Sequence, residues 1–189
     1  ESLIGSGWND LKERGKNTAV KASLNKAKIE LAFEKKVQFL QSSNVLGIIE
    51  GSDKKEEWLV ITAHYDHLGK RGDVIYYGAD DDGSGTVSVI EMAEAFAKAK
   101  AAGKGPRRSI LFMTVSGEEK GLWGSAYYSN NPSIGLEKIT ANLNIDMIGR
   151  TDTERMKPDT LNYVYVVGDD KLSSELKPIS EAANSKYTK

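Results

Sequence analysis

The sequence predicts an α/β fold with a mixed, mainly parallel sheet, and two observations support this. Short, continuously apolar runs recur at Val45–Ile49, Trp58–Ala63 and Ile110–Val115, and such runs are typical of strands covered on both faces. Between the last two, Ser84–Ala102 repeats apolar residues at the three-four spacing of one helix face, and Gly103 follows. Strands that alternate with helices favour a parallel sheet.

The remaining elements follow from the same periodicities. Alternation of apolar and polar residues from Lys28 to Phe39 predicts an antiparallel β-hairpin with one solvated face. After the run at Ile110 we expect, in order, a helix over Leu122–Tyr128, a strand over Leu143–Ile148, a polar loop over 150–162, a strand over Tyr163–Val167 and a helix over Ser173–Asn184. At 189 residues we expect a single domain, with a polar segment over 1–27 and sheet and helices over 28–189.

The composition excludes several classes of protein. Lys and Arg number 26 and Asp and Glu number 27, so the chain lacks the basic surface of a nucleic-acid-binding protein. No apolar stretch approaches the roughly 20 residues that cross a bilayer, and no signal peptide stands at the start. Because cysteine is absent, thiol nucleophiles and thiolate metal ligands are excluded.

Residues able to bind a metal follow the predicted strands. His64 and His67, the two histidines of the chain, come directly after Trp58–Ala63, and acidic residues stand at Asp80–Asp82, at Glu118 and Glu119, and at Asp146. Side chains at the carboxyl ends of parallel strands converge on one crevice. The sequence therefore predicts a metal site there.

Within this set the residues suggest a division of roles. Asp66 is placed to accept the proton of one ring nitrogen of His64, which would orient the other toward a metal. One of Glu118 and Glu119 can bind a metal while its neighbour takes a proton from water. We expect His67 to line the cleft rather than to bind metal.

Simpler or different sites fit the pattern less well. A calcium loop of the EF-hand type fails because Gly78 and Val89 occupy its first and last ligand positions. The glycines are not followed by the Gly-Lys-Ser or Gly-Lys-Thr of a phosphate loop, and no Gly-x-Ser-x-Gly supports a Ser-His-Asp triad. A glycosidase with paired carboxylates would not need His64.

Four motifs, in this order, resemble those of the M28 family of dizinc aminopeptidases. They are His64-Tyr-Asp66, Gly78-Ala-Asp-Asp-Asp-Gly-Ser-Gly85, Ser116-Gly-Glu-Glu-x-Gly-Leu-x-Gly-Ser125 and Asn144-Ile-Asp-Met147, within about Asn44 to Arg150. The chain is most similar to secreted bacterial members that carry a separate protease-associated domain. This similarity implies a secreted or periplasmic location.

The resemblance implies a zinc exopeptidase-like three-layer sandwich that lacks its C-terminal elements, with a role for each matched residue. His64, Asp81 and Asp146 match the ligands of one zinc, and Asp81 also bridges to a second. Glu119 matches a ligand of the second zinc, Glu118 the general base, and Asp66 the residue that orients His64. The peptide bond between Asp81 and Asp82 is often cis in the family. The implied substrate is a peptide with a free amino terminus.

The chain departs from the family at its last zinc ligand, a downstream histidine, because no histidine follows His67. One zinc keeps three ligands and the other only Asp81 and Glu119, so we expect one zinc or none, and little activity. Glu1 in place of Met and the missing ligand indicate a fragment of a longer enzyme. A truncated sheet edge also predicts self-association.

Two other functions stay open at this point. One is a non-catalytic binding module on the same fold, although such a module has no reason to gather so many like charges. The other is a glutaminyl-cyclase-like acyl transferase with a single zinc. It would convert an amino-terminal Gln to a cyclic product.

Overall fold

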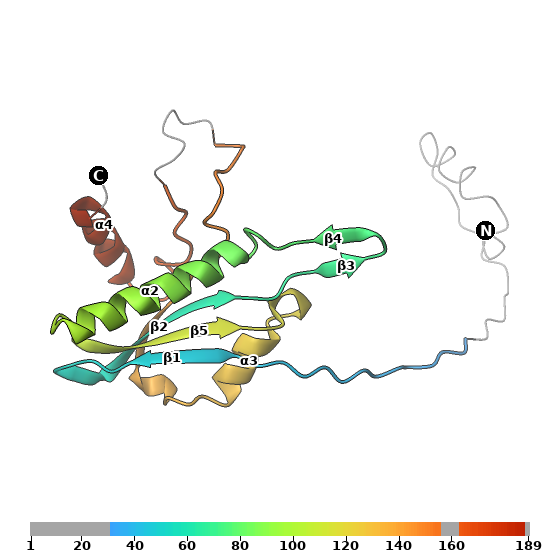
Figure 1. Ribbon diagram of the computed structural model, residues 1–189, viewed down its shortest axis with the longest axis horizontal. Helices are drawn as coiled ribbons and strands as arrows, with labels where there is room; N and C mark the ends of the chain where they lie inside the picture. The colour runs from blue at the N-terminus through green and yellow to red at the C-terminus, as the bar shows by residue number, and fades with distance from the viewer. Residues whose placement is uncertain (1–30, 156–162, 188–189) are drawn as a thin grey trace, which may run out of the picture. The chain divides into compact units, whose positions relative to one another are not determined.

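The computed structural model describes residues 31–155 and 163–187 (Figure 1). The chain divides into two units between Leu40 and Gln41. In the first unit, residues 31–40 contain no helix or strand, and their side chains are exposed. The prediction of a hairpin is therefore wrong for residues 31–39, where Phe33 and Phe39 alternate with polar residues but are not packed against any part of the described chain. Residues 1–30, which include the predicted polar segment, lie outside the described residues.

The second unit is built on a four-stranded sheet with the strand order β1-β5-β2-β6. The strands are β1 (Val45–Ile49), β2 (Lys54–His64), β5 (Arg108–Val115) and β6 (Ile139–Asn144). β2 runs parallel to both β5 and β6, whereas β1 is antiparallel to β5. The predicted mixed, mainly parallel sheet is confirmed.

Helices cover the two faces of this sheet, which makes three layers (Figure 1). On one face, α2 (Gly83–Ala101) inserts Val89 between Ile61, Ala63 and Phe112. On the other face, α3 (Trp123–Asn130) contributes Tyr128 to a cluster with Val60, Leu111, Met113, Val115 and Ile134. Successive side chains of a strand point to opposite faces. Both faces are buried over Val60–His64 of β2 and over most of β5, which explains why these stretches are mainly apolar.

The strand predicted over Leu143–Ile148 lies earlier in the chain than expected. β6 covers Ile139–Asn144, so only Leu143 and Asn144 of the predicted strand are in it. The start of this edge strand was not predicted because Thr140, Asn142 and Asn144 alternate with less polar residues. The side chains of both asparagines turn back to the sheet, where Thr62 Oγ1 lies 2.8 Å from Asn144 Oδ1.

Other elements differ from expectation in smaller ways. A second sheet, which the sequence did not predict, pairs β3 (Gly69–Arg71) with β4 (Val74–Tyr76) as a hairpin. Residues 163–167 were expected to form a strand, but they pair with no strand in the described chain and are largely exposed. The C-terminal helix is present as α4 (Leu176–Tyr187). Two 3-10 turns, η1 (Glu118–Lys120) and η2 (Leu136–Lys138), complete the elements of the described residues.

The register of the parallel strands brings three strand ends to one edge of the sheet. His64 lies opposite Val115 of β5, and Thr62 lies opposite Asn144 of β6. The loop before α2 comes to the same edge, since Asp82 is the N-cap of that helix. The peptide bond between Asp81 and Asp82 is cis, as the family resemblance implied.

Candidate metal centre

The structure gathers most of the residues predicted for the site around one side chain, His64. His64 ends β2 and is only 3% exposed. Its Nε2 atom lies 3.2 Å from Asp81 Oδ1, 3.8 Å from Glu118 Oε2 and 3.9 Å from Asp146 Oδ2. Three carboxylates from three separate segments therefore face a single imidazole nitrogen.

The other ring nitrogen of His64 fixes the ring in this orientation. Nδ1 lies 2.9 Å from the backbone carbonyl oxygen of Asp66 and donates a hydrogen bond to it. Nε2 therefore faces the carboxylates, either as a protonated nitrogen or as a ligand of a cation that it shares with them. The expectation for the side chain of Asp66 needs correction, because its Oδ1 lies 3.9 Å from Nδ1 and instead accepts the backbone N–H of Glu118 at 3.1 Å. In the turn after β2, the backbone carbonyl of Asp66 therefore contacts the ring of His64, and the carboxylate of Asp66 contacts the backbone of Glu118.

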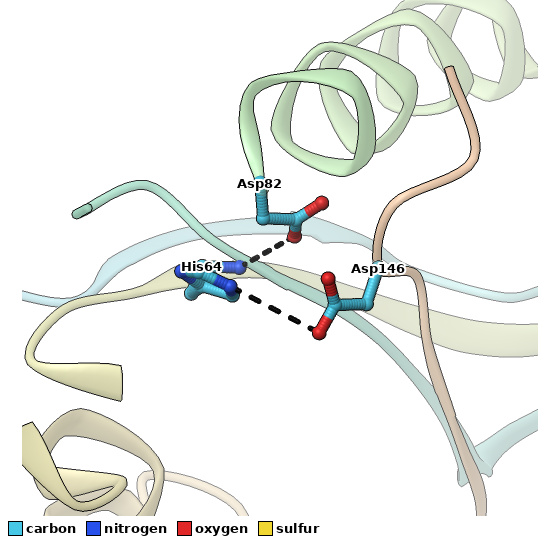
Figure 2. Close-up of side chains that lie close together, drawn as sticks. All are labelled: His64, Asp82 and Asp146. Atoms are coloured by element: carbon cyan, nitrogen blue, oxygen red, sulfur yellow. Dashed lines mark hydrogen bonds and ion pairs between the residues drawn. The ribbon is translucent and has the colours of Figure 1, made fainter. Parts of the chain in front are cut away.

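Asp82 has a structural role, which sets it apart from its neighbour Asp81. Figure 2 shows His64, Asp82 and Asp146 side by side, and the ligand atoms of these three residues lie close enough together to hold an ion. However, the carboxylate of Asp82, a residue only 1% exposed, already accepts three backbone N–H groups, from His64 at 3.1 Å, Gly85 at 3.0 Å and Met147 at 3.3 Å. It caps α2 and joins that helix to the loop ends beyond β2 and β6.

Asp80 is also used to hold the backbone. Its Oδ1 accepts the N–H of Gly149 at 2.7 Å and the hydroxyl of Ser84 at 2.8 Å. In the described chain, Asp81 differs from its two neighbours because its oxygens face histidines instead of backbone donors. Oδ1 lies 3.2 Å from His64 Nε2, and Oδ2 lies 3.8 Å from His67 Nδ1. This is the arrangement of a carboxylate that lies between two centres.

A second group of possible ligands lies on the far side of Asp81. His67 Nδ1 is 2.7 Å from Glu119 Oε1, and these atoms and Asp81 Oδ2 lie within 4.8 Å of one another. From the sequence, His67 was expected to line the cleft. Gly78 is the residue in the sequence that could have indicated the position of His67. A side chain at Gly78 would collide with the side chain of His67.

The electrostatics of the site favour a positive charge at its centre. Burial lowers the pKa of His64, but the Asp66 carbonyl and the negative charges of Asp82, Glu118 and Asp146 outweigh burial and raise this pKa overall. Burial raises the pKa of Asp82, although the backbone N–H groups that it accepts oppose this effect. Imidazole nitrogens and carboxylate oxygens are ligands that zinc prefers, so the donor set fits the metal implied by the family resemblance.

A cavity of about 450 Å³ opens beside this edge of the sheet. His64, Glu118 and Asp146 line one part of it, and apolar side chains such as Met113 and Ile139 line another. A small molecule in the cavity would therefore contact the carboxylates and an apolar wall at once.

Comparison with known proteins identifies the family of the chain. Residues 44–189 match the sequence profile described as "Peptidase family M28". The chain belongs to peptidase family M28. The family resemblance drawn from the four motifs is thereby confirmed.

The relatives and solved structures that resemble this M28 chain are larger proteins. A probable zinc metalloprotease of Leptosphaeria maculans is 34% identical over 62% of this chain and 27% of its own length. A vacuolar membrane protease of Saccharomyces cerevisiae is 34% identical over 57% of this chain and 10% of its own length. The crystal structure of a zinc aminopeptidase from Bacillus subtilis matches with a TM-score of 0.57 and 30% identity, over 76% of this chain and 32% of that one. The chain thus spans about a quarter of the first relative.

Within the residues that the structure describes, no helix is long and apolar enough to cross a membrane.

Proposed function

We propose that this chain forms the core of a zinc-dependent exopeptidase that releases single residues from the free amino terminus of a peptide. The observation that carries this proposal is the position of Glu118. Its carboxylate lies 3.8 Å from His64 Nε2 and lines the cavity, while its backbone N–H is held by Asp66. A carboxylate held in this way can exchange protons with a molecule in the cavity.

His64, Asp81 and Asp146 would hold the zinc of this centre. Zinc bound there supplies Lewis acidity toward a carbonyl oxygen and makes water a stronger acid. Glu118 accepts the proton of the attacking water and then donates it to the departing amine, so that the carboxylate is regenerated at the end of the cycle. Asp66 positions Glu118 for both transfers.

The charge of the site supports a substrate with a free amino terminus. Asp81, Glu118, Glu119 and Asp146 surround only two histidines, which leaves negative charge to attract an ammonium group. The apolar wall around Met113 and Ile139 would accept the side chain of the first residue. We expect the 189-residue chain alone to be weakly active.

The test is Glu118→Gln, assayed with an aminoacyl p-nitroanilide in the presence of zinc. The amide keeps the shape of the side chain but cannot take the proton, so the rate should fall by about 10²–10⁴-fold while zinc binding is retained. Glu94→Gln is the matched control, because Glu94 is an exposed partner of Lys98 on α2, and it should leave the rate unchanged.

Equal rates for wild type and Glu118→Gln would refute the proposal. The absence of any zinc-dependent hydrolysis by zinc-loaded wild type would refute it too. Cyclisation of a peptide with amino-terminal Gln, in place of release of a free amino acid, would assign the site to acyl transfer instead.

A further inference from the structure

The loop that carries Glu118 closes on itself between the end of β5 and the start of α3. The N–H of Gly124 donates to the carbonyl of Ser116 at 2.7 Å, and the N–H of Trp123 donates to the carbonyl of Gly117 at 3.0 Å. The two ends of the loop are therefore in contact at its base. The position of Glu118 beside the cavity depends on how this base is held to the sheet.

A side chain from outside the loop, Asn44, bridges its two ends. β1 runs antiparallel to β5, so the residue just before β1 lies next to the residue just after β5 (Figure 1). Asn44 is half-buried there. Its Oδ1 accepts the N–H of Ser116 at 3.3 Å, and its Nδ2 donates to the carbonyl of Gly124 at 2.8 Å. A carboxamide carries a donor and an acceptor together, so one side chain holds both ends of the loop.

The base of the loop is also shaped to admit this carboxamide. A Cβ atom at Gly124 would lie 2.4 Å from Asn44 Oδ1 and 2.4 Å from the carbonyl oxygen of Ser116. Both distances are far shorter than a van der Waals contact. The loop and Asn44 therefore fit together only with glycine at position 124.

Hydroxyl groups close to Asn44 extend the same connection. Ser42 Oγ lies 2.6 Å from Ser116 Oγ and 3.1 Å from the hydroxyl oxygen of Tyr65. That hydroxyl donates to the carbonyl of Ser43 at 2.6 Å. Because Tyr65 directly follows β2 and Ser116 directly follows β5, the segment before β1 joins the loops after both central strands.

We infer that Asn44 is a positioning residue, which holds the loop so that the carboxylate of Glu118 lies where it can transfer a proton. Asn44 is not among the described residues that line the cavity, so it acts through the loop and not by contact with the substrate. A displacement of about 1 Å in a reacting group can lower a rate by about 10²-fold. The inference rests on the proposed function and deepens it.

The test compares kcat and KM of wild type and Asn44→Ala for an aminoacyl 4-methylcoumarin amide in the presence of zinc. For Asn44→Ala, kcat should fall by about 10–100-fold, and KM should change by less than about twofold because the lining of the cavity is intact. Asn130→Ala is the matched control, because the amide of Asn130 donates to the carbonyl of Ala126 within α3, and it should leave both constants unchanged.

A second comparison separates positioning from a general loss of stability. In the Glu118→Gln background no carboxylate remains to be positioned, so Asn44→Ala should lower the residual rate by less than about twofold. Loss of stability alone would lower the rate by the same factor in both backgrounds. Asn44→Asp keeps the acceptor for Ser116 but loses the donor to Gly124, so its kcat should lie between those of wild type and Asn44→Ala.

A wild-type kcat in Asn44→Ala, or an equal loss of rate in both backgrounds, would overturn the inference and leave the proposed function in place. If the circular dichroism spectrum shows that Asn44→Ala does not fold, the same criteria apply to Asn44→Asp. Absence of zinc-dependent hydrolysis by wild type would overturn the proposed function and the inference together.

Discussion

Asp82→Ala tests whether this aspartate is a structural residue or a metal ligand. In the structure its carboxylate accepts three backbone N–H groups, one of them as the N-cap of α2. Loss of the cap costs about 1 kcal/mol, and each of the two other N–H groups, on His64 and Met147, costs about 1–3 kcal/mol when it loses its acceptor. Removal of a buried carboxylate offsets part of this loss. We therefore expect the free energy of unfolding to fall by about 2–4 kcal/mol.

The assay is urea unfolding of the metal-free chain, followed by circular dichroism. Asp73→Ala is the control, because Asp73 is exposed in the turn between β3 and β4 and should shift the free energy by no more than about 0.5 kcal/mol. Asp82→Asn should lie between the control and Asp82→Ala, since its amide oxygen can still accept two of the N–H groups.

Zinc affinity separates the two neighbouring aspartates. We expect Asp82→Asn to retain zinc at His64, because the oxygens of Asp82 are occupied by the backbone, whereas Asp81→Asn should lose at least about tenfold in affinity. The reasoning fails if Asp82→Ala is as stable as the control, or if Asp82→Asn loses zinc while Asp81→Asn keeps it.

Two further predictions concern the surface of the sheet. Arg107 lowers the pKa of Asp53 from 3.8 to about 2, so the stabilisation from this pair should be complete above about pH 4 and disappear as the pH falls toward 2. Urea unfolding at several pH values should show the difference between wild type and Asp53→Asn shrinking over that interval, and a constant difference would contradict the assignment. In the described part of the chain β6 is an edge strand of the sheet, and Leu143 on it is 50% exposed, so we expect concentration-dependent self-association that Leu143→Lys weakens. Light scattering that finds wild type monomeric at all concentrations would rule this out.

Local patterns were enough to predict the two central strands and the helix that packs on them. β2, β5 and α2 were all expected within a few residues of their observed bounds, because burial requires apolar side chains at a characteristic spacing. β1 is largely exposed and was still predicted with its observed bounds, but two other segments with incomplete burial were predicted wrongly. β6 alternates polar and less polar residues at the sheet edge, and Tyr163–Val167 is apolar but largely exposed.

The sequence alone was also sufficient to select the acidic residues of the predicted site, but their separate roles came from the family resemblance and not from local patterns. Asp80, Asp81 and Asp82 are chemically identical and adjacent, so no local rule distinguishes them. Their roles depend on which groups lie nearby: backbone N–H groups for Asp80 and Asp82, and two histidines for Asp81.

By itself, the sequence determined the chemical types of the ligands, the strand ends that carry them and the family to which the chain belongs. These properties follow from residue identity and from spacing along the chain. Only the tertiary structure decided which atoms meet, because pairing of β2 with both β5 and β6 joins segments far apart in sequence. It also brought His67 against Glu119 beside the backbone of Gly78, a contact that spacing in the sequence does not reveal.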